Sequence, residues 1–377
     1  MSDLRTTVAG IALRNPVLLA SGPLSYDGAA IVRAYEAGVG AVVTKTICRE
    51  AARNPIPHIA RLPYGLLNSE KWSDVEPSAW IDRELPMAVE AGARVIASVG
   101  LDREQVEELA GPVSRTGVDA IEVCSYDGSQ IVPMVRVACR GASHVPIVAK
   151  VSANWPDVCT IAAACVNAGA SGITAIDSVG PALRIDVETA RPLVAGGGGW
   201  LSGSGVLGIA LRVVSDIARM EGRTAIVGTG GVGSADECIE MLMAGASAVG
   251  VCSHFLVGGL ERVAEMVDGL GKRLEELGYV EVRSVIGAGL PGLEASRQRA
   301  QPLPCDTANA VQFRLDRTSC TACGLCVRVC PYGARTTPDR VDRARCRFCG
   351  LCTSVCPVDA LRLHRPSDCA SREGDGT

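Results

Sequence analysis

The stretch GTGGVGSADECIEMLMAGASAVGVCS, residues 228–253, shows how the larger part of this chain is built. It begins at the end of an apolar run (224–231), continues through an amphipathic pattern of helical period (235–245) and returns to a second apolar run (247–253). Apolar runs without polar alternation are typical of strands that are buried on both faces, and a helix between two of them indicates a parallel sheet. The stretch therefore predicts one strand–helix–strand unit.

Similar units recur from residue 15 to about residue 275. Eight apolar runs are found, at residues 16–21, 41–47, 94–100, 120–125, 146–152, 172–178, 224–231 and 247–253. Helical patterns lie between most of them, for example at residues 29–38, 103–114, 158–169 and 235–245. Eight such units predict an α/β fold, a (β/α)8 (TIM) barrel. A doubly wound open sheet is the alternative, but no G-x-G-x-x-G follows the first strand to favour it.

The chain of 377 residues is long enough for one large domain and one small one. We expect the barrel domain to span residues 1–286. A linker rich in Gly, Pro, Ala and polar residues should span 287–312, and a cysteine-rich domain 313–365. Residues 366–377 read as a disordered tail.

The composition argues against several classes of function. The net charge of −4 and the aromatic content of 3% disfavour a nucleic-acid-binding surface. No apolar run reaches the roughly 18–20 residues that a membrane-spanning helix needs, and the N-terminus lacks the pattern of a secretory signal. The 17 cysteines are then expected to be thiols and metal ligands, not disulfides, in a cytoplasmic protein.

Two cysteine runs with one spacing carry the most specific signal. Residues 320–331 and 346–357 both read C-x2-C-x2-C-x3-C-P, the pattern of bacterial ferredoxins with two [4Fe–4S] clusters. The fourth cysteine of each run binds the other cluster in that pattern. One cluster is therefore expected on Cys320, Cys323, Cys326 and Cys356, and the other on Cys330, Cys346, Cys349 and Cys352. Structural zinc is the alternative, but zinc sites usually pair two C-x2-C halves across a longer gap.

Two adjacent clusters form an electron relay. Such a relay, joined to a barrel, needs a second redox centre in that barrel. Lys45 and Lys150 each stand near the end of an apolar run, where a buried ammonium requires an anion or an acceptor. The alternative is a snorkelling lysine or a buried ion pair. The glycine-rich turn at 228–234 and the run ending at residue 253 match the loops after strands 7 and 8, the usual phosphate site of such barrels, although tight packing would also explain the glycines. Flavin mononucleotide (FMN) satisfies both features.

The motifs together resemble the dihydroorotate dehydrogenase family. The similarity covers about residues 5–260 and is carried by NPVLLASG (15–22), VVTKTI (42–47), GLLN (65–68), DAIEV (119–123), IVAKVSAN (147–154), LSGSGVLGIALR (201–212) and the stretch 228–253. This resemblance implies FMN, with contacts from Ala20, Ser21, Gly22, Lys45, Thr46, Lys150, Ser202, Gly203, Gly230, Gly231, Cys252 and Ser253. Asn68 matches a substrate-binding asparagine.

The cysteine-rich domain makes the chain similar to the dihydropyrimidine dehydrogenases. Bacterial two-subunit forms combine such a chain with a separate subunit that oxidises NAD(P)H through a flavin. The resemblance implies a protein electron donor, either a reductase subunit of this kind or a ferredoxin. Family members are often dimers, so a homodimer is expected by analogy.

The fourth strand departs from the family pattern. The family has an Asn-x-Ser-Cys-Pro-Asn type motif there and a mobile loop, which supply substrate contacts and the acid/base residue; this chain reads DAIEVCSYDGSQIVPMV. Cys124 stands in place of Asn, and Cys124, Tyr126 and Asp127 are candidate proton donors. The alternative roles are a small strand-end residue for Cys124 and a turn for Asp127. Asp177 and Ser178 replace an Asn-Thr pair, and Asp177 is a candidate contact of the flavin or of a cationic substrate.

These changes remove paired donors and acceptors that would read a pyrimidine imide, so an altered substrate is expected. The prediction is an FMN- and iron–sulfur-dependent oxidoreductase that reduces an activated C=C or C=N bond of a small molecule. Its predicted catalytic residues are Lys45, Asn68, Cys124 and Asp127. Two alternatives stay open. One is a uracil or thymine reductase with an NAD(P)H-oxidising partner subunit, and the other is an electron-transfer subunit whose barrel has lost catalysis.

Overall fold

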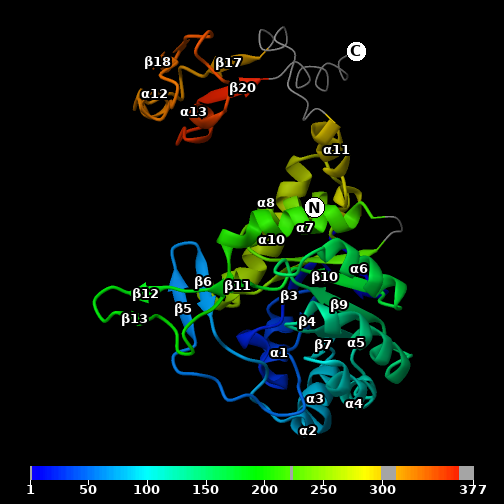
Figure 1. The fold of residues 1–377 in the computed structure, drawn as a ribbon. Coiled ribbons are helices and arrows are strands. Elements are labelled where there is room, and N and C mark those ends of the chain that lie inside the picture. The colour runs from blue at the N-terminus through cyan, green and yellow to red at the C-terminus, as the bar shows by residue number, and fades with distance from the viewer. Residues whose placement is uncertain (1, 221–223, 299–310, 365–377) are drawn as a thin grey trace. The chain divides into compact units, whose positions relative to one another are not determined.

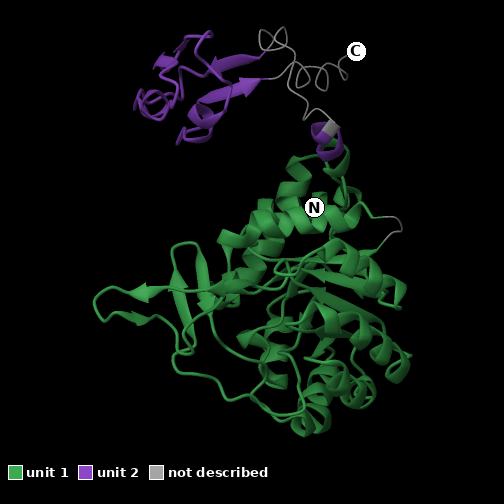
Figure 2. Ribbon diagram, in the orientation of Figure 1, with its two compact units in different colours: residues 1–292 green, residues 293–377 purple. Residues whose placement is uncertain are grey.

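The computed structural model describes residues 2–220, 224–298 and 311–364. The chain divides into two compact units, Met1–Gly292 and Leu293–Thr377 (Figure 2). The first unit runs past the predicted end of the barrel domain at residue 286. Within the predicted linker, α11 (Leu290–Gln298) is helical, whereas residues 299–310 and the predicted tail at 366–377 lie outside the described residues.

The first unit is a closed barrel of eight parallel strands with helices on its outer side (Figure 1). The strands are β3 (Val17–Leu19), β4 (Ala41–Val43), β7 (Val95–Gly100), β8 (Ala120–Cys124), β9 (Ile147–Val151), β10 (Gly172–Ala175), β15 (Ala225–Thr229) and β16 (Ala248–Val251). Each of the eight predicted runs contains one of them. The barrel prediction is confirmed, and the open doubly wound sheet is wrong because β16 pairs with β3 and closes the ring.

The outer helices bury one face each against the strands. They are α1 (Gly28–Glu36), α3 (Leu85–Glu90), α4 (Arg103–Ser114), α5 (Gly128–Gly141), α6 (Val158–Asn167), α7 (Leu207–Ala218), α8 (Ala235–Met243) and α10 (Glu261–Glu276). Asp27, Asp102 and Ser234 begin α1, α4 and α8, and each side chain accepts a hydrogen bond from a first-turn N–H group. These caps fix where the chain turns back after the carboxyl end of a strand.

The barrel interior changes from apolar to polar along the strands. At the amino ends, Leu18, Ile96 and Val227 pack with the hairpin of β1 (Thr6–Val8) and β2 (Ile11–Leu13). Side chains of a strand alternate between its faces, so the residues two positions further along point into the barrel again. These include Ser98 and Thr229 on β7 and β15. Polar groups therefore collect inside the carboxyl end of the barrel.

A second sheet lies after the carboxyl ends of β4 and β10. It has the order β11-β14-β6-β5, with β5 (Ile59–Leu62), β6 (Gly65–Asn68), β11 (Val179–Ala182) and β14 (Gly199–Ser202). A short pair, β12 (Ile185–Asp186) and β13 (Arg191–Pro192), extends from it. The sequence does not indicate this sheet, because one of its pairings, β14 with β6, joins segments more than 100 residues apart. Asn68, for example, pairs with Trp200.

The second unit contains a short repeated arrangement. Helices α12 (Leu325–Arg328) and α13 (Leu351–Ser354) each begin two positions after the second cysteine of a run. Two antiparallel pairs complete it, β17 (Gln312–Leu315) with β20 (Leu361–His364) and β18 (Arg335–Thr337) with β19 (Arg340–Val341). This is the predicted ferredoxin-like domain.

Candidate active site and cluster-binding cavities

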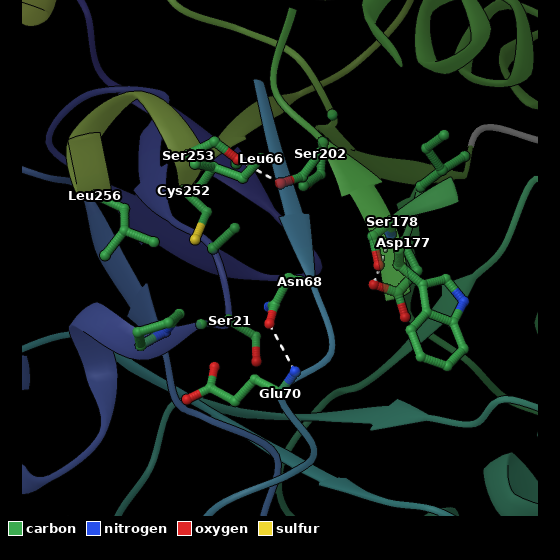
Figure 3. A pocket seen from close by; sticks show the side chains of 18 of the residues that line it. Ser21, Leu66, Asn68, Glu70, Asp177, Ser178, Ser202, Cys252, Ser253 and Leu256 are labelled. Carbon is green, nitrogen blue, oxygen red and sulfur yellow. Dashed lines mark hydrogen bonds between the residues drawn. The ribbon is translucent and has the colours of Figure 1, made fainter. Parts of the chain in front are cut away.

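A cavity opens at the carboxyl ends of the barrel strands, and the second sheet contributes to its lining (Figure 3). It brings together nearly all of the barrel residues that the sequence singles out. These are Ala20, Ser21, Gly22, Lys45, Thr46, Asn68, Cys124, Lys150, Asp177, Ser202, Gly203, Gly230, Gly231, Cys252 and Ser253. The barrel geometry makes this possible because parallel strands deliver their following residues to one face.

Asp127 is the exception among the predicted catalytic residues. Its side chain is exposed, begins helix α5 and accepts a hydrogen bond from the N–H group of Ser129 at 2.8 Å. That bond lowers the pKa of Asp127, so the carboxyl is ionised near neutral pH and holds no proton to give. Asp127 is therefore a helix cap at the edge of the site. This position does not suit a proton donor, which is the role predicted for it.

Glycines and hydroxyls form one end of the cavity. Gly230 and Gly231 follow β15 with φ values of 121° and 89°, which favour glycine. A Cβ on Gly231 would lie 2.6 Å from the backbone nitrogen of Leu207, so the turn cannot accept a side chain there. From the neighbouring strand end, the Ser253 hydroxyl donates to Ser202 Oγ at 2.8 Å (Figure 3). This end offers backbone N–H groups and hydroxyls to a bound molecule.

Lys45 lies deeper in the cavity and is paired with a carboxylate. Its Nζ is 2.5 Å from Oε1 of Glu70, and the two side chains are only 5% and 11% exposed. The N–H group of Glu70 donates to Asn68 Oδ1 at 2.7 Å, which ties Asn68 to the same pair (Figure 3). The side-chain oxygen of Asn68 is thus engaged within the protein, and its amide NH2 has no partner among the described residues and can donate to a bound molecule.

Lys150, Asp177 and Cys124 form a second polar group across the cavity. Lys150 Nζ is 3.3 Å from Asp177 Oδ1, and the Cys124 thiol donates to Asp177 Oδ2 at 3.7 Å. Burial acts to lower the pKa of Lys150, but the neighbouring carboxylates outweigh it and the pKa is raised. Burial and the charge of Asp177 raise the pKa of Cys124 well above its usual value. The ammonium is therefore charged and the thiol protonated at neutral pH.

Glu122 is a buried carboxyl that the sequence did not single out. It points into the barrel two positions before Cys124 and is 1% exposed. Thr174 Oγ1 donates to its Oε2 at 2.7 Å, and Oε1 has no hydrogen-bond partner in the described part of the chain. Burial raises the pKa of Glu122. Its position in an otherwise apolar run, AIEVC, was the available signal.

Aromatic rings line the outer part of the cavity. Tyr126 and Trp200 stack with their centroids 5.5 Å apart and an interplanar angle of 25°. Trp72 also lines the cavity and donates through Nε1 to the carbonyl of Glu50. The sequence does not indicate Trp200 as a site residue, because the pairing of β14 with β6 is what brings it to Tyr126. The rings offer flat surfaces to a planar molecule.

The cysteines of the second unit line two separate cavities. One is lined by Cys320, Cys323, Cys326 and Cys356, and the other by Cys330, Cys346, Cys349 and Cys352. Each cavity thus combines three cysteines of one run with the last cysteine of the other. This is the crossed arrangement that the spacing predicts for two clusters.

Structural zinc, the alternative that the sequence left open, would need the thiols of each cavity to meet on one ion. Four thiolates on one zinc ion each lie about 2.3 Å from it and so crowd together. Within the described residues, no group of three or more His, Cys, Asp or Glu side chains is close enough to hold a single ion. Three cysteines of one run together with the last cysteine of the other form the ligand set of a two-cluster ferredoxin, so these cavities fit two clusters.

Comparisons with known proteins agree with this site. The family model for dihydroorotate dehydrogenase matches residues 3–110 and 127–274, and a model for 4Fe-4S binding domains matches 313–336 and 340–362. The chain belongs to the dihydroorotate dehydrogenase family. It is thereby an oxidoreductase of a family that acts on CH–CH bonds and binds FMN, and the 4Fe-4S matches add two iron–sulfur clusters.

Relatives of this family match most of the barrel. The chain is 34% identical to the catalytic subunit of dihydroorotate dehydrogenase B (NAD(+)) of Endomicrobium trichonymphae, over 76% of this chain and 96% of the relative. The proteins of the same name from Pelobacter propionicus and Pyrococcus abyssi are 31% and 30% identical, over 76% of this chain and 98% and 99% of theirs. About a quarter of this chain therefore has no counterpart in these relatives.

The residues present fit the FMN of the family. Thr229 Oγ1 is buried at the end of β15 and has no hydrogen-bond partner among the described residues, which leaves it for a bound molecule. The adjoining glycine turn and the pair Ser202–Ser253 suit a phosphate. Lys45 and Lys150 suit the electron-rich edge of a flavin.

The family pattern is interrupted at one place. Residues 111–126 lie between the two matched segments and include all of β8, Cys124 and Tyr126. This segment contains DAIEV (119–123), which resembles the family, and also Cys124 and Tyr126, where the sequence departs from the family motif. No helix in the described part of the chain is long and apolar enough to cross a membrane.

The thiol of Cys124 should resist alkylation at mildly alkaline pH. The thiolate is the reactive form, and both burial and Asp177 keep Cys124 protonated. Iodoacetamide at pH 8 should leave Cys124 unmodified in the folded protein, as read by peptide mass spectrometry. The same peptide alkylated in urea is the control. Labelling of the folded protein at the rate of the urea control would contradict the assigned environment.

Proposed function

We propose that this chain is the catalytic subunit of a reductase that transfers hydride to an activated C=C or C=N bond of a planar small molecule other than a pyrimidine. The observation that carries the proposal is the state of Asp177. Its Oδ1 is engaged by Lys150 and by the N–H group of Ser178, and its Oδ2 by Cys124. Most of the acceptor sites of Asp177 are therefore used within the protein, which leaves it poorly suited to read the N–H groups of an imide.

The remaining groups suit a conjugated acceptor. The amide NH2 of Asn68 is a donor for an electron-withdrawing carbonyl, and the stacked rings of Tyr126 and Trp200 offer a flat apolar surface. Bound FMN would supply the hydride. The Cys124 thiol lines the cavity and is protonated at neutral pH, and it would supply the proton to the substrate.

Electrons would reach the barrel from another protein through the iron–sulfur domain. The relatives are named as catalytic subunits with NAD(+), which supports an NAD(P)H-oxidising flavin subunit as the donor. Because this chain carries its own ferredoxin-like domain, a soluble ferredoxin is the other donor that we propose. A homodimer of the barrel is proposed by analogy with the family.

The second candidate substrate is a pyrimidine. The names of the relatives favour dihydroorotate, and the similarity to dihydropyrimidine dehydrogenases favours uracil or thymine. The departure from the family motif at Cys124 and Tyr126 speaks against both, because these residues lie on the substrate side of the cavity.

Reoxidation of the reduced flavin separates these functions. The holoprotein is reduced with dithionite without air, freed of reductant and mixed with orotate, with uracil or with an aryl-substituted enone. Of the three compounds, we expect only the enone to restore the absorbance of oxidised flavin after mixing. Replacing Cys124 by alanine should slow that step and leave reduction of the flavin unchanged. Reoxidation by orotate or uracil would overturn the proposal, and reoxidation by no small molecule would indicate an electron-transfer subunit.

A further inference from the structure

The two cluster cavities are related by the internal repeat but differ at one position. Arg335 is the fifth residue after Cys330, and Leu361 is the fifth residue after Cys356. Both side chains are 3% exposed, and each lines one cavity only. Arg335 lines the cavity of Cys330, Cys346, Cys349 and Cys352, whereas Leu361 lines the other. Equivalent positions of the repeat therefore place a cation beside one cavity and an apolar side chain beside the other.

The guanidinium of Arg335 is only partly satisfied by the protein. Its Nη1 donates to the carbonyl of Pro338 at 2.7 Å, and its carbon lies 4.5 Å from the centroid of the Phe313 ring. Nε and Nη2 are buried and have no hydrogen-bond partner among the described residues. A buried arginine with unpaired N–H groups is costly unless an anion meets it. The cavity that Arg335 lines, which four cysteine thiolates share, can hold such an anion.

The backbone around the two clusters is closely matched. The N–H group of Gly333 donates to the backbone carbonyl of Cys330 at 3.1 Å, and at the equivalent position the N–H group of Asp359 donates to that of Cys356 at 3.2 Å. The cavity with Leu361 has no charged residue in its described lining other than the cysteines. The side chain at the repeated position is thus the main electrostatic difference between the two cavities.

We propose that Arg335 donates hydrogen bonds through Nε and Nη2 to the cluster held by Cys330, Cys346, Cys349 and Cys352, and so raises its reduction potential above that of the other cluster. Each cluster takes up one electron and becomes more negative, with no proton required. A buried positive charge stabilises that added negative charge, and hydrogen bonds to sulfur and net charge are known to set cluster potentials. Leu361 gives no such stabilisation.

A difference in potential determines which of the two clusters is reduced first. An electron that enters the ferredoxin-like domain from a one-electron donor protein would settle first on the Arg335 side. The inference rests on cluster binding alone and holds whichever substrate the barrel reduces.

Potentiometric titration of the full chain, followed by electron paramagnetic resonance, tests the inference. We expect two one-electron midpoints in the unaltered protein. Replacing Arg335 by methionine should lower the higher midpoint and leave the lower one in place. The reduced-to-oxidised ratio at that cluster should fall about tenfold at fixed potential, equivalent to about 59 mV for a one-electron couple. Two equal midpoints in the unaltered protein would overturn the proposal.

A matched variant controls for the loss of charge. Arg340 is an exposed arginine of the same unit, and Arg340→Met removes the same charge where water screens it. Both midpoints should stay unchanged in that variant, and equal shifts in the two variants would contradict a specific role for Arg335. Iron and sulfide content shows whether both clusters assemble. If Arg335→Met fails to assemble them, Arg335→Lys, which keeps the charge, should retain two separated midpoints, and their merging would refute the proposal.

Discussion

Replacing Cys323 and Cys356 together by alanine should remove one cluster and leave the other intact. The two cysteines line the same cavity although they belong to different runs. The double variant should therefore keep about half of its iron, since each [4Fe–4S] cluster holds four of the eight iron atoms. It should also lose turnover that is driven by a one-electron donor, because the relay is broken. Iron analysis and a donor-linked assay measure the two effects.

A second pair of substitutions gives the matched control. Cys352 and Cys356 are neighbours in one run but line different cavities. Replacing both by alanine should damage both clusters and remove most of the iron. Ligation of each cluster by a single run would give the reverse result, with half of the iron kept in this variant and most of it lost when Cys323 and Cys356 are replaced. Chemically reduced flavin should still react with substrate in both variants if the barrel remains folded.

Replacing Lys150 by methionine should have the largest effect on the barrel. Lys150 is buried and faces Asp177, and Glu122 lies in the same interior. Removing one partner of a buried ion pair usually destabilises a protein by about 3–5 kcal/mol because the other charge is left without compensation. The variant should unfold at lower urea concentration and retain less FMN. Urea unfolding at two FMN concentrations separates the loss of stability from the loss of cofactor.

Two further variants complete this test. Lys71 also lines the cavity but is exposed and forms no ion pair among the described residues, so Lys71→Met should change the free energy of unfolding by less than about 0.5 kcal/mol. The double variant Lys150→Met, Asp177→Asn should recover part of the lost stability, because the unpaired carboxylate is removed as well. A Lys150→Met protein as stable as the Lys71→Met protein would refute the buried ion pair.

Local patterns in the sequence were sufficient for much of the architecture. An apolar run or a helical period is set by neighbouring residues, and the run AVVTKTI at 41–47 indicates a buried strand without knowledge of its partners. The cysteine spacing likewise predicts the crossed pairing of the two runs. The barrel residues expected to contact FMN all line one cavity because a closed parallel barrel leaves the ends of its strands little freedom.

The chemistry of the site depended on contacts between distant residues. Nothing local shows that Lys45 would pair with Glu70, that Tyr126 would stack on Trp200, or that Asp127 would turn away to cap α5. These outcomes follow from the second sheet and from the direction in which the chain leaves β8.

The amino-acid sequence by itself determined the barrel, the ferredoxin-like domain and the redox class, because period and spacing are properties of neighbouring residues. Only the tertiary structure decided which charges are compensated and which are left free. Arg335 and Leu361 illustrate this, since their positions in the repeat are visible in the sequence. Their burial beside two separate cavities is not, because it arises only when the two cysteine runs fold against each other.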